Sequence, residues 1–261
     1  MKTIKIATAG RRKIEGTLFI PKRSRTARPG ALFLHGWGGD RQRQLLPAKL
    51  LSDLGFVSLA VDLRGHGKTR RLGQSVSAYD NLKDALAAYD FLASRKNVNK
   101  DLMLVAGYSY GGFLAVLVSA ERNVRWLALR SPALYRDKDM FIPKAAIKRR
   151  GLMAFRRRPL APSDAIGLRA SAGIRAHVLV IEADRDRVIP RQQIRNYVRA
   201  FRQAQSIKHR IIHEADHAMS REEWYLAAVE TFMNWLRDKE ATRKPASKAR
   251  TALARRIASP S

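Results

Sequence analysis

The feature that most constrains this chain is a serine held between two glycines, where one apolar run ends and another begins. Residues 107–111 read Gly-Tyr-Ser-Tyr-Gly, after the apolar run 102–106 and before the apolar run 113–120. A strand that turns this sharply into a helix strains the serine backbone, and the glycines let the two elements pack closely. The hydroxyl of Ser109 then points outward at a helix N-terminus, where free N–H groups favour negative charge. The pattern predicts a nucleophile, although a lone serine at such a junction is more often a helix cap.

A second glycine-rich loop follows an earlier apolar run. Residues 35–39 read His-Gly-Trp-Gly-Gly, directly after the run 31–34. A loop in this position can offer a backbone N–H to an oxyanion, and the residue after the nucleophile supplies the second donor. The expected donors are the N–H groups of Trp37 and Tyr110, with a plain tight turn as the alternative for the loop.

An acidic residue and a histidine follow two later strands. The β-rich run 178–181 leads into Asp186, and the run 210–213 leads into His217. A nucleophilic serine needs a base to take its proton and a carboxylate to orient that base. The order Ser109, Asp186, His217, with each residue just past a strand end, predicts a catalytic triad.

Other residues compete for the roles of acid and base. Asp184 and Glu182 are close enough to Asp186 in the sequence to serve as the acid. His209 and His213 are the alternatives for the base, but both fall within an expected strand, where an imidazole is more often packed or on the surface.

The loops together carry a resemblance to a known family. Over residues 30–236 the chain resembles the α/β-hydrolase superfamily, and most of all its small esterase, dienelactone-hydrolase and serine-peptidase-like branches. The stretch 62–69, Asp-Leu-Arg-Gly-His-Gly-Lys-Thr, is similar to the superfamily's D-x-R-G-x-G-x-S loop. The stretch 186–190, Asp-Arg-Val-Ile-Pro, is similar to its D-x-x-V-P segment, which favours Asp186 as the acid.

Some positions depart from the resembled pattern or stand outside the triad. Tyr110 occupies a place where compact residues are common, and its side chain is expected to shape the pocket. Asp62 and His66 belong to an earlier loop and are expected to be structural. The dienelactone hydrolases proper use a cysteine nucleophile, and this chain has no cysteine. The resemblance to that branch therefore concerns the scaffold only.

Apolar runs alternate with helical patterns along most of the chain. With 261 residues and 46% hydrophobic content, the chain can bury a full core. The alternation predicts an α/β fold with a mainly parallel sheet of about eight strands and helices on both faces. The first two expected strands form an antiparallel hairpin at the sheet edge, joined by residues 10–16. The expected strands cover residues 3–8, 17–21, 31–35, 56–61, 101–107, 125–131, 177–183 and 207–213.

One domain is predicted over residues 1–238, with a small cap inserted at 132–175 and a basic tail at 239–261. The cap segment contains four prolines and cannot form one helix. In the resembled superfamily an insertion at this point covers the active site. The candidate pocket residues are Met140, Phe141, Ile142, Leu152, Met153 and Phe155, and packing within the insertion is the alternative for each. The tail is expected to be disordered or transiently helical.

The net charge of +29 comes from 51 Lys and Arg against 22 Asp and Glu. Such a field attracts polyanions and steers anionic ligands. The basic residues are scattered and no aromatic-interleaved groove accompanies them, which favours solvated faces over a nucleic-acid site. The tail could contact nucleic acid or membrane headgroups, and nothing in it specifies which.

Neither a metal nor another cofactor is expected, because cysteine is absent and no His or carboxylate cluster has ligand spacing. The sequence shows no secretory signal and no apolar run near the roughly 18 residues that span a bilayer, so a cytoplasmic protein is expected. The oligomeric state is not determined by these patterns.

Resemblance and triad together predict hydrolysis of a small-molecule carboxylic ester through a covalent acyl-enzyme. Peptidases, amidases, thioesterases and acyltransferases use the same residues and stay open as alternatives. The alternative from another class is a non-catalytic binder of anions or nucleic acid on a hydrolase scaffold. The three filled triad positions argue against it.

Overall fold

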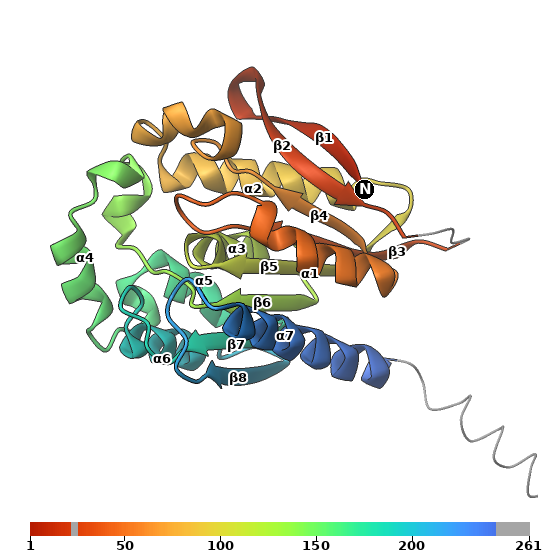
Figure 1. The fold of residues 1–261 in the computed structure, drawn as a ribbon. Helices are drawn as coiled ribbons and strands as arrows, with labels where there is room; N and C mark the ends of the chain where they lie inside the picture. The colour runs from red at the N-terminus through yellow and green to blue at the C-terminus, as the bar shows by residue number, and fades with distance from the viewer. Residues whose placement is uncertain (22–25, 244–261) are drawn as a thin grey trace, which may run out of the picture.

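The computed structural model describes residues 1–21 and 26–243, and eight strands of this part form one twisted sheet (Figure 1). The order across the sheet is β1-β2-β4-β3-β5-β6-β7-β8, and only the β1–β2 and β2–β4 pairs are antiparallel. The strands are β1 (Lys2–Thr8), β2 (Arg12–Phe19), β3 (Arg28–Leu34), β4 (Val57–Val61), β5 (Val98–Tyr108), β6 (Trp126–Arg130), β7 (His177–Ala183) and β8 (Ser206–Ile212).

Helices cover both faces of the sheet (Figure 1). The helices are α1 (Gln42–Asp53), α2 (Ala78–Ala93), α3 (Tyr110–Glu121), α4 (Arg149–Arg156), α5 (Ile166–Gly173), α6 (Arg191–Ala200) and α7 (Glu222–Arg243). Short 3-10 turns are η1 (Ala9–Arg11), η2 (Gly67–Gln74), η3 (Asp137–Met140), η4 (Lys144–Ala146) and η5 (Pro162–Asp164). None of the helices described here is long and apolar enough to cross a bilayer.

The central strands are buried on both sides, as parallel strands covered by helices must be. All five residues of β4 are buried, and so are the last five of β3. On one face α1 and α7 enclose a cluster in which Phe33 and Phe232 meet edge to face at 6.2 Å. On the other face α2, α3, α5 and α6 enclose the larger cluster. Helix α4 lies beyond the sheet edge at which β5 to β8 end (Figure 1), and its Leu152 belongs to the larger cluster.

The predicted α/β fold with a mainly parallel eight-stranded sheet is confirmed. One boundary is wrong: the hairpin connection is the short turn η1, and Gly16 lies inside β2, paired with Val61. A Cβ on Gly16 would lie 2.9 Å from the Leu59 side chain, so glycine allows β2 and β4 to approach closely. The sequence pattern marks this glycine as a loop residue because it cannot reveal such a contact.

The predicted division into domain, cap and tail stays a prediction, but the structure refines its parts. Helix α5 packs against α3 through buried Gly167 and Leu168, so the end of the cap segment belongs to the main layer. Helix α7 continues to Arg243, into the segment expected to be tail. Residues 244–261 of the predicted tail lie outside the described residues.

The loop after β4 is fixed to α2 by a buried ion pair. Arg64 Nη2 lies 2.6 Å from Asp84 Oδ1, and the Arg64 backbone N–H donates to Asp84 Oδ2 at 3.1 Å. The side chain of Asp84 is fully buried. Asp62, at the start of the loop, pairs with Arg41. Both residues of the D-x-R motif therefore anchor the loop, as the sequence suggested.

Replacing Asp84 by Ala is expected to lower the free energy of unfolding by about 3–5 kcal/mol, because Arg64 loses its principal partner while still buried. Urea denaturation measures the change. Asp53→Ala is the control, since its ion pair with Lys49 is about 60% exposed on both sides and is worth less than about 1 kcal/mol. Equal effects of the two substitutions would contradict the burial argument.

Candidate active site

Ser109 occupies a strained turn between β5 and α3. Its backbone has φ 52° and ψ −112°, in the left-handed half of conformational space that costs a non-glycine residue on the order of 1–3 kcal/mol. The flanking glycines are required by close contacts: a Cβ on Gly107 would lie 2.2 Å from the Gly111 carbonyl oxygen, and one on Gly111 would lie 2.3 Å from the Leu34 oxygen. The strand-to-helix elbow expected from the sequence is present.

Backbone hydrogen bonds hold the strained serine in place. The Ser109 N–H donates to the Arg130 carbonyl at 2.9 Å. Its own carbonyl accepts from the N–H groups of Ala133 at 2.8 Å and Phe113 at 3.1 Å. Because Arg130 ends β6 and Ala133 lies just past it, the neighbouring strand fixes the position of the nucleophile.

The structure brings Ser109, His217 and Asp186 together in one hydrogen-bonded chain. His217 Nε2 lies 2.9 Å from Ser109 Oγ, and His217 Nδ1 lies 2.7 Å from Asp186 Oδ2. A carboxylate can only accept, so Nδ1 carries the proton and Nε2 is free to accept the serine hydroxyl proton. The other Asp186 oxygen accepts the N–H groups of Val188 at 2.8 Å and Ile189 at 2.7 Å, which fixes the carboxylate.

The competing acids and bases lie elsewhere. Glu182 is buried and bonds His209 at 2.8 Å, so these two competitors pair with each other across β7 and β8. Asp184 lies 3.7 Å from His213, whose side chain is 82% exposed. Neither pair has a hydrogen bond to Ser109, so the geometry favours Asp186 and His217.

The two expected oxyanion donors come from different segments of the chain. Tyr110 is the first residue of α3, so its N–H has no acceptor within the helix. Trp37 belongs to the loop after β3, and its ring meets the Tyr110 ring edge to face at 5.3 Å. The Tyr110 side chain is fully buried and its hydroxyl donates to Asn81 at 2.9 Å, and its expected part in shaping the pocket stays a prediction. The donor roles of both N–H groups stay predictions.

A pair of buried histidines supports the loop that carries Trp37. His35 and His66 rings lie 4.8 Å apart, and the His66 ring meets the Trp37 ring at 4.7 Å. His35 donates from Nδ1 to the Gly36 carbonyl at 2.8 Å and accepts the Leu63 N–H at Nε2, which defines a neutral ring. Burial lowers the pKa of His35. Burial, together with the neighbouring His35, lowers the pKa of His66 to about 4.

Tyr108 and Arg130 belong to the site, and the sequence analysis does not identify them. The Tyr108 hydroxyl donates to the backbone carbonyl of His217 at 2.9 Å, and the two rings lie 5.2 Å apart. The Arg130 guanidinium lies 4.0 Å from the centre of the Tyr108 ring. Burial raises the pKa of Tyr108 to about 12, so its hydroxyl stays a donor. Tyr108 is one of the variable positions of the elbow motif, so the motif itself assigns it no role.

Arg43 also holds the segment after His217. Its guanidinium donates to the carbonyls of Ala218 and Met219, both at 2.9 Å. The Tyr225 hydroxyl donates to the Arg43 carbonyl at 2.6 Å. Helices α1 and α7 thus meet at the loop that carries the histidine.

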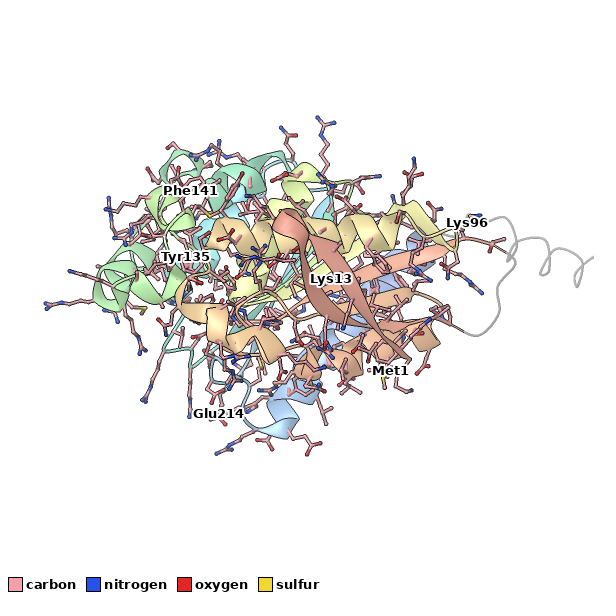
Figure 2. The ribbon with its side chains drawn as sticks, turned by 90° about the horizontal axis from the view of Figure 1, so that it is seen from above. Met1, Lys13, Lys96, Tyr135, Phe141 and Glu214 are labelled. Carbon is pink, nitrogen blue, oxygen red and sulfur yellow. The ribbon has the colours of Figure 1, made fainter. Side chains whose placement is uncertain are left out.

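The apolar residues expected to form a pocket wall separate into two groups. Met140 and Leu152 are buried, and Phe155 packs against the larger core cluster. Phe141 is 69% exposed and contacts only the Tyr79 ring, at 5.1 Å, among the aromatic side chains described. Figure 2 shows Phe141 and Tyr135 in the cap region. Ile142 is also exposed, so neither Phe141 nor Ile142 is packed within the insertion, and their part in a pocket stays a prediction.

The model of the alpha/beta hydrolase family matches residues 31–230. The chain belongs to this family. An uncharacterized protein of Mycobacterium tuberculosis is 29% identical over 179 residues, which are 67% of this chain and 58% of that protein. An AB hydrolase superfamily protein of Bacillus subtilis is 29% identical over 92 residues, 35% of this chain and 32% of that one. The chain thus spans 58% of the length of the first of these relatives.

Solved structures show the same fold. Est1E from Butyrivibrio proteoclasticus, with ferulic acid bound, superposes with a TM-score of 0.66 and 19% identity, over 88% of this chain and 97% of that one. A dienelactone hydrolase from Anabaena variabilis gives 0.64 and 20% identity, over 91% and 96%. An acylaminoacyl peptidase from Pyrococcus horikoshii gives 0.68 and 12% identity, over 92% and 41%. At such identities the likeness concerns the fold.

Within residues 1–21 and 26–243, no group of three or more His, Asp or Glu side chains is placed to hold a metal ion.

Acidification is expected to destabilise the fold through the buried histidines. An unfolded His66 takes a proton near pH 6.5 and the folded one only near pH 4, so the unfolded state binds more protons between these values. Neutral His66 makes its full contribution to the free energy of unfolding above pH 6.5. This contribution, on the order of 2–3 kcal/mol, is lost as the pH falls towards 4. Urea denaturation across this range measures the loss.

The variant His66→Phe keeps a ring against Trp37 and should show a smaller loss on acidification than the wild type. The exposed His213→Gln is the matched control and should keep the full loss. A His66→Phe profile identical to that of the wild type would contradict the assignment.

Proposed function

We propose that this protein is a serine hydrolase that cleaves a carboxylic ester through a covalent acyl-enzyme. The observation that carries the proposal is the chain of hydrogen bonds from Asp186 through His217 to Ser109, at 2.7 and 2.9 Å. Membership of the alpha/beta hydrolase family supports hydrolytic chemistry. The choice of an ester is an analogy with the fold neighbour Est1E, whose structure holds ferulic acid.

In the acylation step, Ser109 Oγ attacks the ester carbonyl carbon while its proton passes to His217 Nε2. The resulting imidazolium is stabilised by the Asp186 carboxylate at Nδ1. Negative charge develops on the carbonyl oxygen, where the N–H groups of Trp37 and Tyr110 would bind it. The carbon–oxygen bond to the alcohol then breaks, and the alcohol leaves with the proton from His217.

In the deacylation step, His217 Nε2 takes a proton from water as the water oxygen attacks the acyl carbon. The bond between that carbon and Ser109 Oγ breaks, and the proton returns from His217 to the serine. The products are the free acid and the original enzyme, so the cycle needs no cofactor. The strained elbow supports both steps, because it fixes Oγ beside the imidazole with little freedom to lose.

The triad variants test the proposal directly. Ser109→Ala and His217→Ala are expected to lower kcat/KM for p-nitrophenyl esters by about 10⁴-fold or more, and Asp186→Asn by about 10³–10⁴-fold. A fluorophosphonate probe should label the wild type and not Ser109→Ala. His213→Ala is the matched control and should keep both labelling and turnover.

An unlabelled and inactive wild type, folded by circular dichroism, would contradict the proposal and favour a non-catalytic anion binder. Comparison of p-nitrophenyl esters with aminoacyl anilides and acyl-thioesters separates esterase from peptidase and thioesterase activity. A preference for anilides or thioesters would leave the proposed triad standing and replace the ester as the proposed substrate.

Tyr108 is proposed as a positioning residue, because its hydroxyl bonds the His217 backbone. Tyr108→Phe removes this one bond, worth about 0.5–1.5 kcal/mol, and is expected to lower kcat about 3- to 10-fold with little change in KM. A loss of kcat at unchanged KM, with the unfolding temperature kept, distinguishes positioning of His217 from a merely structural role. Tyr79→Phe, on the cap side and 40% exposed, is the control.

A further inference from the structure

Two cations of the cap segment face one aromatic ring beside the proposed site. Lys144 Nζ lies 5.1 Å from the centre of the Tyr135 ring and 5.1 Å from that of Trp37. The Arg156 guanidinium carbon also lies 5.1 Å from the Tyr135 ring centre. Tyr135 contacts Tyr110, the residue after the nucleophile, at 5.9 Å. The two cations are therefore separated from the elbow by a single layer of side chains.

Arg156 is buried, with an exposed fraction of 5%. Its Nε donates to the Leu134 carbonyl at 3.1 Å and its Nη1 to the Val188 carbonyl at 3.4 Å. Val188 also donates its N–H to Asp186. The guanidinium is thus fixed between the loops that follow β6 and β7, and both loops belong to the site.

No carboxylate neutralises these cations among the described residues. Asp139 is the acidic side chain that acts on Lys144 electrostatically, but it is 1% exposed and both its oxygens bond Arg136, at 2.8 and 2.9 Å. Within residues 1–21 and 26–243, neither Lys144 nor Arg156 forms a salt bridge of 4.0 Å or less with a carboxylate. Arg156 is buried and Lys144 half-buried, and charges removed from water are normally paired, so two cations without a counter-ion are costly unless an anion joins them.

The protonation states fit an anion site. Burial, together with the nearby charge of Arg156, lowers the pKa of Lys144 to about 8, so it is still mostly cationic at pH 7. Burial raises the pKa of Tyr135 to about 12, so its hydroxyl stays protonated and adds no negative charge.

A cavity of about 330 Å³ opens beside the proposed oxyanion loop. Trp37 and Gly38 form its wall on the loop side, Arg70 lines it from η2, and Ala145 lines it from the cap. Ala145 directly follows Lys144, and Arg70 adds a third cation. The volume of this cavity is at the lower end of the range for small-ligand pockets.

The cap surface around the cavity carries the same sign of charge. Residues 132–160 contain nine Lys and Arg against two Asp, and one of the two is the buried Asp139. Figure 2 shows nitrogen-tipped side chains projecting from this region around Tyr135 and Phe141. Such a rim attracts anionic ligands towards the site. The exposed cations are Lys138, Lys148, Arg149, Arg150, Arg157 and Arg158.

From these observations we infer that the substrate is an ester that carries a carboxylate, bound by Lys144 under the cap with Arg156 close by. The inference rests on the proposed hydrolase function and names its substrate class. The carboxylate would stand where the two cations have no counter-ion, and the ester carbonyl would reach Ser109.

Paired esters that differ in charge test the inference. Mono-4-nitrophenyl adipate is compared with 4-nitrophenyl hexanoate for a carboxylate on the acyl side, and 4-acetoxybenzoate with 4-acetoxybenzamide for one on the alcohol side. The wild type is expected to prefer the charged member of at least one pair by about 10-fold or more in kcat/KM. One charge-assisted hydrogen bond is strong enough to give a preference of this size.

Lys144→Met should reduce this preference about 10-fold while turnover of the neutral esters is kept, which also shows that the variant is folded. Lys148→Met is the matched control, because it removes the same charge from an exposed position four residues away and should keep the preference. An equal loss in both variants would assign the effect to general surface charge and overturn the Lys144 site.

The preference of the wild type should decline above about pH 8, as Lys144 loses its proton. The charged groups that face Lys144 are Arg156 on α4 and Asp139 on η3, and the neutral Tyr135 ring contacts both Lys144 and Arg156. Both esters of a pair need His217 equally, so the ratio of their kcat/KM values reports the protonation of Lys144 alone. A ratio near one in both pairs, with neutral esters still cleaved, overturns the inference and leaves the hydrolase function standing. Absence of cleavage and of fluorophosphonate labelling overturns the hydrolase function itself.

Discussion

The backbone of Ser109 is held in a conformation that a serine does not adopt on its own, and the rest of the site is arranged around it. The strain persists because the surroundings determine it several times over. Gly107 and Gly111 leave no room for a Cβ, and the ends of β6 and the first turn of α3 bind the serine's N–H and carbonyl. Since these contacts are made by buried backbone, the position of the hydroxyl depends on the packing of the sheet and hardly on loop motion.

The histidines around this serine differ in their roles because their hydrogen-bond partners differ. His35 and His66 donate to backbone carbonyls, lie in apolar surroundings and stay neutral, so they support the Trp37 loop as aromatic rings. His217 donates to the Asp186 carboxylate, which stabilises a positive imidazole. The acceptor of the Nδ1 hydrogen bond thus distinguishes the two packing histidines from His217, the proposed base.

Much of the fold and the candidate site follows from the sequence because the signals are local. The elbow glycines, the strand-end positions of Asp186 and His217, and the alternation of apolar runs each occupy a few adjacent residues. Contacts between distant segments leave no such signal. Gly16 appears as a loop residue until β4 is placed beside it, and Lys144 and Arg156 look like other basic residues until both are found at the Tyr135 ring. Burial likewise separates Met140 from its neighbour Phe141, which hydrophobicity alone cannot do. The catalytic roles themselves remain proposals.

The hydrogen bonds of Arg43 have a consequence for the order in which the molecule can assemble. The carbonyls of Ala218 and Met219 that this side chain binds lie 175 and 176 residues further along the chain. During synthesis from the N-terminus, the elbow with Ser109 can therefore form well before the segment that fixes His217 exists. A growing chain that has just passed Asp186 contains the proposed nucleophile and acid without the proposed base, and the candidate site is completed only when the start of α7 docks on α1. Long-range closure of this kind makes formation of the candidate site a late event in folding.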